Sequence, residues 1–457
     1  MPKSTLIIKH SVREEREAST MKFHSPRWKT HSVKEALQLP EGSSVRVAGW
    51  VHTIRDLGGI VFLMLRDSDG LIQVVASKSE LLPEVFSKFK EIKPETVVSI
   101  EGTTKKSLKA PGGVEIRASS IDILNKASVS PHLEPASRSK LSLDERLDNR
   151  VVDLRKPRNL VIFKFQHVLL RHIRKFLDEN GFIEVFTPKL IATATEGGAA
   201  LFPIAYFDKE AFLAQSPQLY KEQLSSVFER VYEIGPLFRA EESQTDRHVS
   251  EYIGVDVEVA FATYEEVMRL LEEMLVYSTS KTVEELEEEL RRVELSFLKL
   301  EKPFPRITYD EAISILTEEG VKIEWGEDLT TEAERKLGEV FKGPYFIVDW
   351  PTRVKPFYIM PKPDNPDLSL SFDLMIGRIE VASGGQRIHD KDLLISRLKS
   401  SGLEPESFKH HLKCFDWGMP PHSGWGLGLA RLVMALLGLP DVREAILYPR
   451  DRWRLVP

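Results

Sequence analysis

The sequence predicts an α+β protein with two structural parts, on three observations. Residues 44–118 contain five short runs in which apolar and polar residues alternate, as in a small β-barrel. Residues 159–180 and 262–295 have apolar residues at helical spacing. Residues 231–258 and 368–382 have the pattern of antiparallel strand pairs, so the second part mixes helices with strands.

Length and composition narrow the class of protein. The chain has 457 residues, enough for two or three domains, and its 42% hydrophobic and 29% charged residues are normal for a globular protein. The single cysteine, Cys414, excludes a disulfide framework and a multi-cysteine metal site. Nothing in the sequence resembles a transmembrane span or a signal peptide, so we expect no membrane contact and a cytoplasmic location. The net charge of -6 is uninformative about nucleic acids, because one local basic face can bind them.

The first part is expected to be a small barrel at residues 22–125, after a flexible extension at residues 1–21. Its expected strands are residues 44–54, 60–66, 71–76, 96–102 and 114–118. A helix is expected at residues 79–90, with Ser79 as its N-cap. Five strands with a helix between the third and fourth are typical of an OB-fold, which binds single-stranded nucleic acid on one face. A small barrel without a ligand is the alternative.

Two side chains favour nucleic-acid binding by this barrel. Phe62 and Gln73 fall on adjacent expected strands, as a ring that stacks on a base and an amide that reads its edge would. Lysines at 105, 106 and 109 and Arg117 suit phosphate contacts, although such a cluster is more often a solvated surface.

The second part is expected to span residues 158–457, after a proline-rich and charged hinge at residues 126–157. It begins with the helix at 159–180, which stops at Gly181, and a strand at 182–185 that ends before Pro188. Residues 296–345 show no clear pattern. Further strands are expected at 345–349, 357–360, 368–376 and 378–382, and a helix at 432–437.

The strand pair at residues 231–258 has an unusual connection. Its first strand ends at the string FRAEE, residues 238–242, and a polar loop containing Arg247 and His248 follows before alternation resumes. Arginine is well suited to holding phosphate with its forked donors. A surface hairpin held by ion pairs is the alternative.

Two glycine-rich strings complete the pattern, SGGQR at 383–387 and GWGLGLAR at 424–431. The first could be a plain turn, and the second is not the dinucleotide fingerprint. The order of the pieces is more specific than either string. A helix and strand ending at Pro188 come first, FRAEE with Arg247 and His248 follows, and a glycine-rich step from strand to helix ends at Arg431.

This order resembles the three signature motifs of class II aminoacyl-tRNA synthetases, and the barrel resembles that of the aspartyl, asparaginyl and lysyl subclass. The strings ATATEGG, AQSPQLYK, FRAEE, SGGQR and YPRD are similar to those of archaeal-type aspartyl-tRNA synthetases, from about residue 33 onward. The resemblance implies a catalytic domain built on an antiparallel β-sheet flanked by helices. It also implies an anticodon-binding barrel that uses Phe62 and Gln73, and a homodimer whose interface contains the Pro188 helix–strand unit.

The implied reaction is ATP-dependent attachment of L-aspartate to tRNA(Asp) through an aspartyl-adenylate, which needs positioning and charge stabilisation rather than an enzyme nucleophile. Arg239 on the α-phosphate and Arg431 on the γ-phosphate would be catalytic. The other implied ATP-binding residues are Glu241, Arg247, His248, Val249, Glu380 and Gly428. Glu380 and Ser383 match positions that bind Mg²⁺, an ion suited to oxygen ligands shared with phosphates. The family usually has an acid where this chain has Ala430.

The residues implied to bind aspartate are Glu196, Gln218, Lys221, Arg239, Asp256, Ser383 and Arg387. Lys221 and Arg387 would supply two cations for the side-chain carboxylate, with the acids and Gln218 holding the ammonium group or orienting those cations. Asparaginyl enzymes typically have leucine and glutamate at positions 221 and 256, so this chain favours aspartate. A surface lysine is the alternative for Lys221.

His52 and Pro111 bear on the choice of tRNA. Members restricted to tRNA(Asp) tend to carry Trp and Lys at these positions, and relaxed members carry His and Pro. We therefore expect tRNA(Asn) to be aspartylated as well, through weaker selection at the third anticodon base.

Three other functions remain open from the sequence: an asparaginyl-tRNA synthetase, an aspartate-activating paralogue such as an asparagine synthetase, and a non-catalytic RNA-binding relative. The barrel argues against the paralogue. The presence of Arg239, Glu380 and Arg431 argues against the non-catalytic relative.

Overall fold

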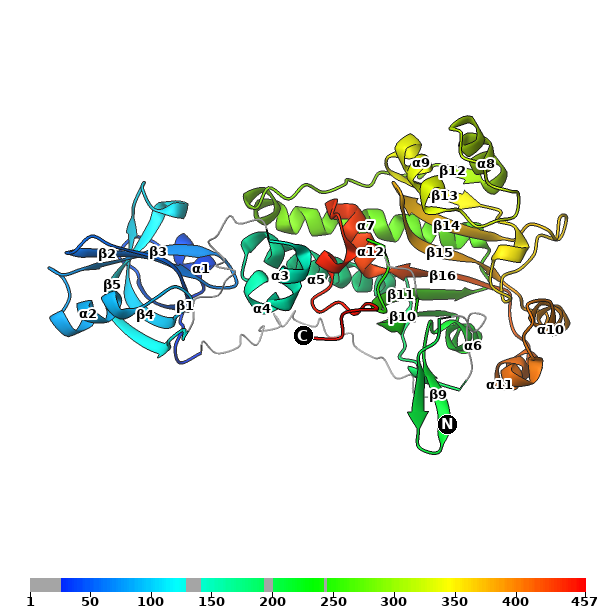
Figure 1. Ribbon diagram of the computed structural model, residues 1–457, viewed down its shortest axis with the longest axis horizontal. Helices are drawn as coiled ribbons and strands as arrows, with labels where there is room; N and C mark the ends of the chain where they lie inside the picture. Colours follow the sequence, from blue (N-terminus) through cyan, green and yellow to red (C-terminus); the bar gives the residue numbers. More distant parts are fainter. Residues whose placement is uncertain (1–25, 129–140, 193–199, 242–244) are drawn as a thin grey trace, which may run out of the picture. The chain divides into compact units, whose positions relative to one another are not determined.

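The computed structural model describes residues 26–128, 141–192, 200–241 and 245–457 (Figure 1). The chain divides into two compact units, Met1–Ala136 and Ser137–Pro457. The expected extension at residues 1–21 lies outside the described residues.

The first unit is a closed barrel in which the strands neighbour one another in the order β1-β2-β3-β5-β4. The strands are β1 (Ser44–Asp56), β2 (Ile60–Arg66), β3 (Leu71–Ser77), β4 (Val97–Lys106) and β5 (Val114–Asn125). The other elements are α1 (Val33–Gln38), α2 (Pro83–Glu91) and η1 (Pro111–Gly113). With α2 between the third and fourth strands, the predicted OB-fold is confirmed.

Helix α2 starts later than predicted. Its N-cap is Leu82 and its first residue is Pro83, whose fixed backbone angle suits the first turn of a helix. Ser79 does not cap this helix, because its hydroxyl pairs with that of Ser77 at 2.8 Å.

The second unit is built on an eight-stranded sheet with the order β12-β13-β14-β15-β16-β11-β10-β6. Its strands are β6 (Ile183–Glu184), β10 (Arg230–Phe238), β11 (Glu251–Ala260), β12 (Arg306–Thr308), β13 (Pro344–Val348), β14 (Ser371–Ile376), β15 (Ile379–Arg387) and β16 (His422–Gly428). A smaller sheet contains β7 (Leu190–Ile191), β9 (Lys209–Leu213) and β8 (Pro203–Tyr206). The predicted antiparallel sheet is confirmed, since only the β6–β10 and β12–β13 pairs of the large sheet are parallel.

Three helices form the main core with this sheet. The long helices are α5 (Pro157–Glu179) and α7 (Tyr264–Arg292), and Figure 1 shows α7 running along the sheet. With α12 (Leu429–Leu437) they bury apolar residues such as Phe165 and Leu271 against Val255 and Val257 of β11. Each such side chain stabilises the fold by about 1.5–3 kcal/mol.

Other helices of the second unit are α6 (Gln218–Phe228), α8 (Tyr309–Glu318), α9 (Thr331–Phe341), α10 (Lys391–Ser400), α11 (Lys409–Phe415), η2 (Thr352–Val354), η3 (Pro405–Phe408) and η4 (Val442–Ala445). In the described ranges, no helix is long and apolar enough to cross a membrane.

Two short helices, α3 (Leu143–Asp148) and α4 (Arg150–Asp153), occupy part of the expected hinge. A capping box between Ser142 and Glu145 starts α3. Arg150 of α4 is buried and donates to the carbonyls of Ile446 and Leu447 at 2.7 and 2.8 Å. These bonds attach the segment to the second unit.

The strand predicted at residues 357–360 does not form. Only Ile359 makes an isolated bridge, with Arg387. Pro356 and Pro361 flank the segment, and proline cannot donate to a strand ladder.

The glycine-rich string ending at residue 428 is a central strand, β16, followed directly by α12. A Cβ atom at Gly424 would lie 2.1 Å from the carbonyl oxygen of Val257 on the neighbouring strand. Glycine therefore permits a close approach of β16 to β11 that no other residue allows.

A β-bulge determines which side chains of β15 share one face. The register shifts where Leu374 pairs with Ala382 but Met375 pairs with Glu380, so Val381 is the extra residue. Strict alternation would place Glu380 and Ser383 on opposite faces, but the bulge lets both line the same cavity.

Candidate active site

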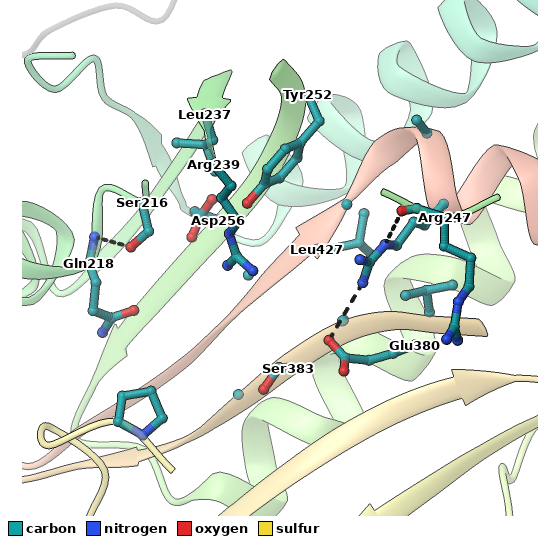
Figure 2. A pocket seen from close by; sticks show the side chains of 18 of the residues that line it. Ser216, Gln218, Leu237, Arg239, Arg247, Tyr252, Asp256, Glu380, Ser383 and Leu427 are labelled. Atoms are coloured by element: carbon teal, nitrogen blue, oxygen red, sulfur yellow. Dashed lines mark hydrogen bonds and ion pairs between the residues drawn. The ribbon is translucent and has the colours of Figure 1, made fainter. Parts of the chain in front are cut away.

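A cavity of about 290 Å³ lies among β10, β11, β15, β16 and the first turn of α12 (Figure 2). Most of the predicted site residues line it: Gln218, Arg239, Glu241, Arg247, His248, Val249, Asp256, Glu380, Ser383, Arg387, Gly428 and Arg431. Figure 2 shows an elongated arrangement, with Ser216 and Gln218 on one side and Arg247 on the other. Predicted residue Glu196 lies outside the described residues.

Four arginines give the cavity its positive character: Arg239, Arg247, Arg387 and Arg431. Arg239 follows β10 and extends into the cavity beside Asp256 in Figure 2, with its guanidinium carbon 5.8 Å from the centre of the Tyr252 ring. Its Nη1 lies 3.7 Å from Oε1 of Glu241. Arginine forks in this number suit a polyphosphate ligand.

Arg247 is held rigidly at the other side of the cavity. Its guanidinium donates to the carbonyl of Arg378 at 3.0 Å and to the Thr331 hydroxyl at 3.2 Å, and pairs with Glu334 at 2.6 Å. Its own carbonyl accepts a bond from Arg431 Nε at 3.2 Å. The loop between β10 and β11 is therefore tied to α12, which fixes the separation of these two arginines.

The surroundings of His248 favour the neutral form of its ring. Its Nε2 lies 3.3 Å from Glu241 Oε2, and its Nδ1 is 2.6 Å from the Thr245 hydroxyl. Burial and the neighbouring arginines lower the pKa of His248 despite the Glu241 carboxylate. A neutral imidazole with fixed partners is suited to hydrogen bonding rather than to charge neutralisation.

Glu380 is the carboxylate that suits a cation. Loss of hydration within the cavity, followed by repulsion from Asp373, raises the pKa of Glu380 to about 7. Its nearest cation is Arg431, with 4.0 Å between NH1 and Oε1. Among the described residues, no group of three or more His, Cys, Asp or Glu side chains could hold a metal. A divalent ion at Glu380 and Ser383 would thus require further oxygen ligands, which a phosphate chain supplies.

Lys221 is not a surface lysine, since it is only 1% exposed. Its ammonium donates to Asp256 Oδ1 at 3.1 Å and to the Trp425 carbonyl at 2.9 Å, and lies 3.5 Å from Glu258 Oε2. The structure therefore places Lys221 behind Asp256 rather than in the cavity wall, where Asp256 itself stands.

Arg387 is a buried cation that does line the cavity. Its Nε donates to Glu258 Oε1 at 3.0 Å, and one NH2 donates to Gln218 Oε1 at 3.3 Å. The Tyr358 ring lies 5.4 Å from its guanidinium carbon. These contacts fix the guanidinium at the side of the cavity where Gln218 stands.

Sequence reasoning missed several lining or supporting residues: Ser216, Tyr252, Glu258, Lys355 and Tyr358. Alternation along β11 contains a signal for two of them, because Tyr252, Asp256 and Glu258 differ by even numbers and so share one strand face. Ser216, Lys355 and Tyr358 lie in connections, where no periodicity reveals the direction of a side chain.

The barrel brings Phe62 and Gln73 to one face. Phe62 pairs with Val75 and Met64 pairs with Gln73, so Phe62 and Gln73 are diagonal neighbours that share an outward face. The Gln73 amide donates to Glu115 at 3.0 Å. Of the two tRNA-selecting positions, His52 lies on β1 and Pro111 in η1.

An OB-fold joined to an antiparallel sheet with an arginine-lined cavity defines the architecture of a class II aminoacyl-tRNA synthetase. Residues 142–452 match the family of class II tRNA synthetases (D, K and N), and residues 45–124 match the OB-fold nucleic acid binding domain. The chain belongs to this D, K and N family of class II tRNA synthetases, as the motifs predicted.

The similarity extends over nearly whole chains. An aspartate--tRNA(Asp/Asn) ligase from Methanopyrus kandleri is 51% identical over 91% of this chain and 97% of that protein. An aspartate--tRNA(Asp) ligase from Pyrococcus abyssi is 46% identical over 94% of this chain and 100% of that protein. Among solved structures, asparaginyl-tRNA synthetase from Pyrococcus horikoshii with asparaginyl-adenylate is 37% identical, with a TM-score of 0.89 over 94% of this chain and 99% of that chain. Aspartyl-tRNA synthetase from Entamoeba histolytica is 31% identical, with a TM-score of 0.84 over the whole of both chains.

Proposed function

We propose that this chain attaches L-aspartate to tRNA(Asp) and to tRNA(Asn), with ATP, through an aspartyl-adenylate. The observation that carries the proposal is a cavity with Arg247 and Arg431 on one side and Arg387, bonded to Gln218, on the other. The names of the relatives from Methanopyrus kandleri and Archaeoglobus fulgidus, both aspartate--tRNA(Asp/Asn) ligases, support the substrates. Such an enzyme acts in the cytoplasm, where its tRNA substrates are charged.

In the first step, an oxygen of the aspartate α-carboxylate attacks the α-phosphorus of ATP, and pyrophosphate leaves. Arg239 is placed to neutralise the charge that develops on the α-phosphate. Arg247 and Arg431 hold the outer phosphates, while Glu241 and His248 hold the adenine. In the second step, the terminal ribose hydroxyl of the tRNA attacks the adenylate carbonyl, and AMP leaves.

Glu380 and Ser383 would hold Mg²⁺ together with phosphate oxygens. The raised pKa of Glu380 fits this role, because a nearby divalent charge stabilises a carboxylate that burial disfavours. The ion would neutralise part of the charge on the phosphates.

Aspartate binds at the side of the cavity occupied by Gln218 and Arg387. Arg387 pairs with the side-chain carboxylate of the substrate, and Lys221 adds positive charge from behind Asp256. Asp256 and Gln218 receive the α-ammonium group. A neutral asparagine amide gains less from this pair of cations.

Aspartate should support ATP–pyrophosphate exchange, and asparagine should support it at least about 100-fold less well, because a charged site rejects a neutral isostere. The measurement is the exchange rate against the concentration of each amino acid. Faster exchange with asparagine would make the chain an asparaginyl enzyme, and no exchange with either would make it a non-catalytic relative.

The geometry at His52 supports relaxed tRNA selection. His52 is the extra residue of a β-bulge in β1, since Val51 pairs with Leu65 and Thr53 pairs with Met64. Arg66 donates to His52 Nδ1 at 3.1 Å, which leaves the proton of a neutral ring on Nε2. Burial and the Arg66 charge lower the pKa of His52, so the ring offers an uncharged donor.

The protein should charge a tRNA(Asn) transcript with aspartate at a rate within about tenfold of the rate for tRNA(Asp). The substitution His52→Trp should reduce the charging of tRNA(Asn) and leave that of tRNA(Asp) unchanged. A bulky ring at the bulge would restore selection by shape. Charging of tRNA(Asp) by the same variant is the matched control. Failure of the wild-type protein to charge tRNA(Asn) would limit it to tRNA(Asp).

We also infer the homodimer. Strand β6 is the outer strand of the large sheet, and the segment around it exposes Ile183, Phe186 and Leu190, with Phe186 80% exposed. Exposed apolar side chains next to an unpaired strand edge suit a second copy of the same chain.

A further inference from the structure

A cluster of buried ionisable side chains lies next to the cavity, and these side chains have no role in the proposed reaction. Glu222 of α6 faces two histidines, His411 of α11 and His422 of β16. The distances from Glu222 Oε2 are 3.3 Å to His411 Nε2 and 3.8 Å to His422 Nε2. All three side chains are buried. Buried charges are costly unless they compensate one another, so the state of one member affects the others.

Two hydrogen bonds connect this cluster to the cavity. Glu222 Oε1 accepts from Gln218 Nε2 at 2.7 Å, and Gln218 Oε1 accepts from Arg387 at 3.3 Å. Gln218 and Arg387 both line the cavity. His422 is also the direct cross-strand neighbour of Arg387. A change in the charge or position of Glu222 is therefore transmitted to two residues that face the substrate.

The partners of His422 favour its charged form. Its Nδ1 donates to the Pro420 carbonyl at 2.7 Å, and its Nε2 faces the Glu222 carboxylate, so both nitrogens point at acceptors. Burial opposes this charge, but the carboxylates of Glu222 and Glu258 prevail and raise the pKa of His422 above its ordinary value. His411 Nδ1 accepts from the Gln223 amide at 3.2 Å, so Nε2 is the nitrogen that faces Glu222.

The charge of His422 changes the net charge of the buried ionisable groups next to the cavity. Lys221 and Arg387 are permanent cations among these groups. They form ion pairs with Asp256 and Glu258. Arg387 is also connected to Glu222 through hydrogen bonds of Gln218. Loss of the proton from His422 makes the charge next to the cavity more negative by one unit, beside a site that must accept the carboxylate of aspartate.

We propose that His422 is a positioning residue that, when protonated, balances Glu222, holds Gln218 and Arg387 in place, and so sets the affinity for aspartate relative to asparagine. The inference rests on the proposed aspartate activation. Aspartate carries one more negative charge than asparagine, so only aspartate binding should depend strongly on the charge of His422.

The test compares the wild-type protein with His422→Asn, whose amide keeps a donor near the Pro420 carbonyl. Exchange is measured against aspartate and asparagine from about pH 6 to pH 9, where a histidine of raised pKa titrates. In the wild type, KM for aspartate should rise as the pH rises through the pKa of His422. In the variant, KM for aspartate should be roughly tenfold higher below that pKa, without the pH step, because one unit charge is lost nearby. The kcat and the KM for asparagine should change much less.

A double variant separates charge from structure. Glu222→Gln removes the unbalanced carboxylate and can still accept from Gln218, so Glu222→Gln/His422→Asn should recover most of the wild-type KM for aspartate. Glu222→Gln alone should keep a low KM and lose the pH step, which tests the idea even if His422→Asn does not fold. His410→Gln, an exposed neighbour on α11, is the matched control and should behave as wild type.

Three results would overturn the inference: an unchanged KM in His422→Asn, a further loss in the double variant, or a persistent pH step in Glu222→Gln. Absence of aspartate-dependent exchange in the wild type would instead overturn the proposed function, and the inference with it.

Discussion

Arg239→Ala should lower aspartate-dependent ATP–pyrophosphate exchange by about 10³-fold or more, because one preorganised donor at the reacting phosphate contributes that much to rate. The side chain extends into the cavity beside Asp256, and Arg247 is committed to Glu334, Thr331 and a carbonyl. Arg247 is therefore not available to replace Arg239 at the reacting phosphate.

The exchange assay should be run beside tRNA binding, which the barrel provides and which should change little in Arg239→Ala. Arg230→Ala is the matched control, since Arg230 begins the same strand but is exposed and donates to the Asn180 carbonyl. Near-normal exchange by Arg239→Ala would show that Arg239 does not neutralise the α-phosphate.

Lys221→Met should lower the free energy of unfolding by about 3–5 kcal/mol, the usual cost of leaving buried charges without their partner. The ammonium pairs with Asp256 at 3.1 Å and lies 3.5 Å from Glu258, and all three side chains are buried. Exchange with aspartate should also fall below detection, because the site then carries excess negative charge. Chemical denaturation and the exchange assay measure the two effects.

Lys175→Met is the control for removing a lysine, because its ion pair with Glu179 is exposed and should contribute less than about 1 kcal/mol. Adding Asp256→Asn to Lys221→Met should restore part of the stability by removing one unpaired carboxylate. A stability for Lys221→Met equal to that of the control would mean that the buried pair contributes nothing to the fold.

The elements with a regular period were predictable from the sequence. Alternation located all five barrel strands, and helical spacing located α5 and α7 to within a few residues at each end. The strand pair β10 and β11 was found for the same reason, because Val255 and Val257 alternate with polar residues.

Short helices and a glycine-rich strand were not predictable from the spacing of apolar residues. Residues 296–345 hold α8 and α9, which have only 10 and 11 residues, so each helix repeats its apolar spacing over about three turns. Strand β16 is rich in glycine, so it lacks the side chains that would mark it as a strand. Its position follows from backbone contacts with β11 and β15, which are properties of the folded sheet.

The candidate site was predictable as a set of residues but not as a geometry. The motifs located nearly every lining residue that carries charge, including Arg239, Glu380 and Arg431. They did not reveal that Lys221 lies behind Asp256, since the direction of a side chain depends on packing between α6 and β11. The bulge at Val381 was equally hidden, because a register shift belongs to a strand pair rather than to one strand.

The position of His52 in a β-bulge means that its side chain can change with little effect on the stability of the barrel. The residue has no cross-strand partner in the β1–β2 ladder, and its half-buried ring is held by Arg66, which Glu95 holds in turn at 2.7 Å. Exchange of this one side chain leaves the barrel core and its ladder untouched. Under the role proposed for His52, a lineage could broaden or narrow the set of tRNAs served by one enzyme through a single substitution, with little change in how well the enzyme folds.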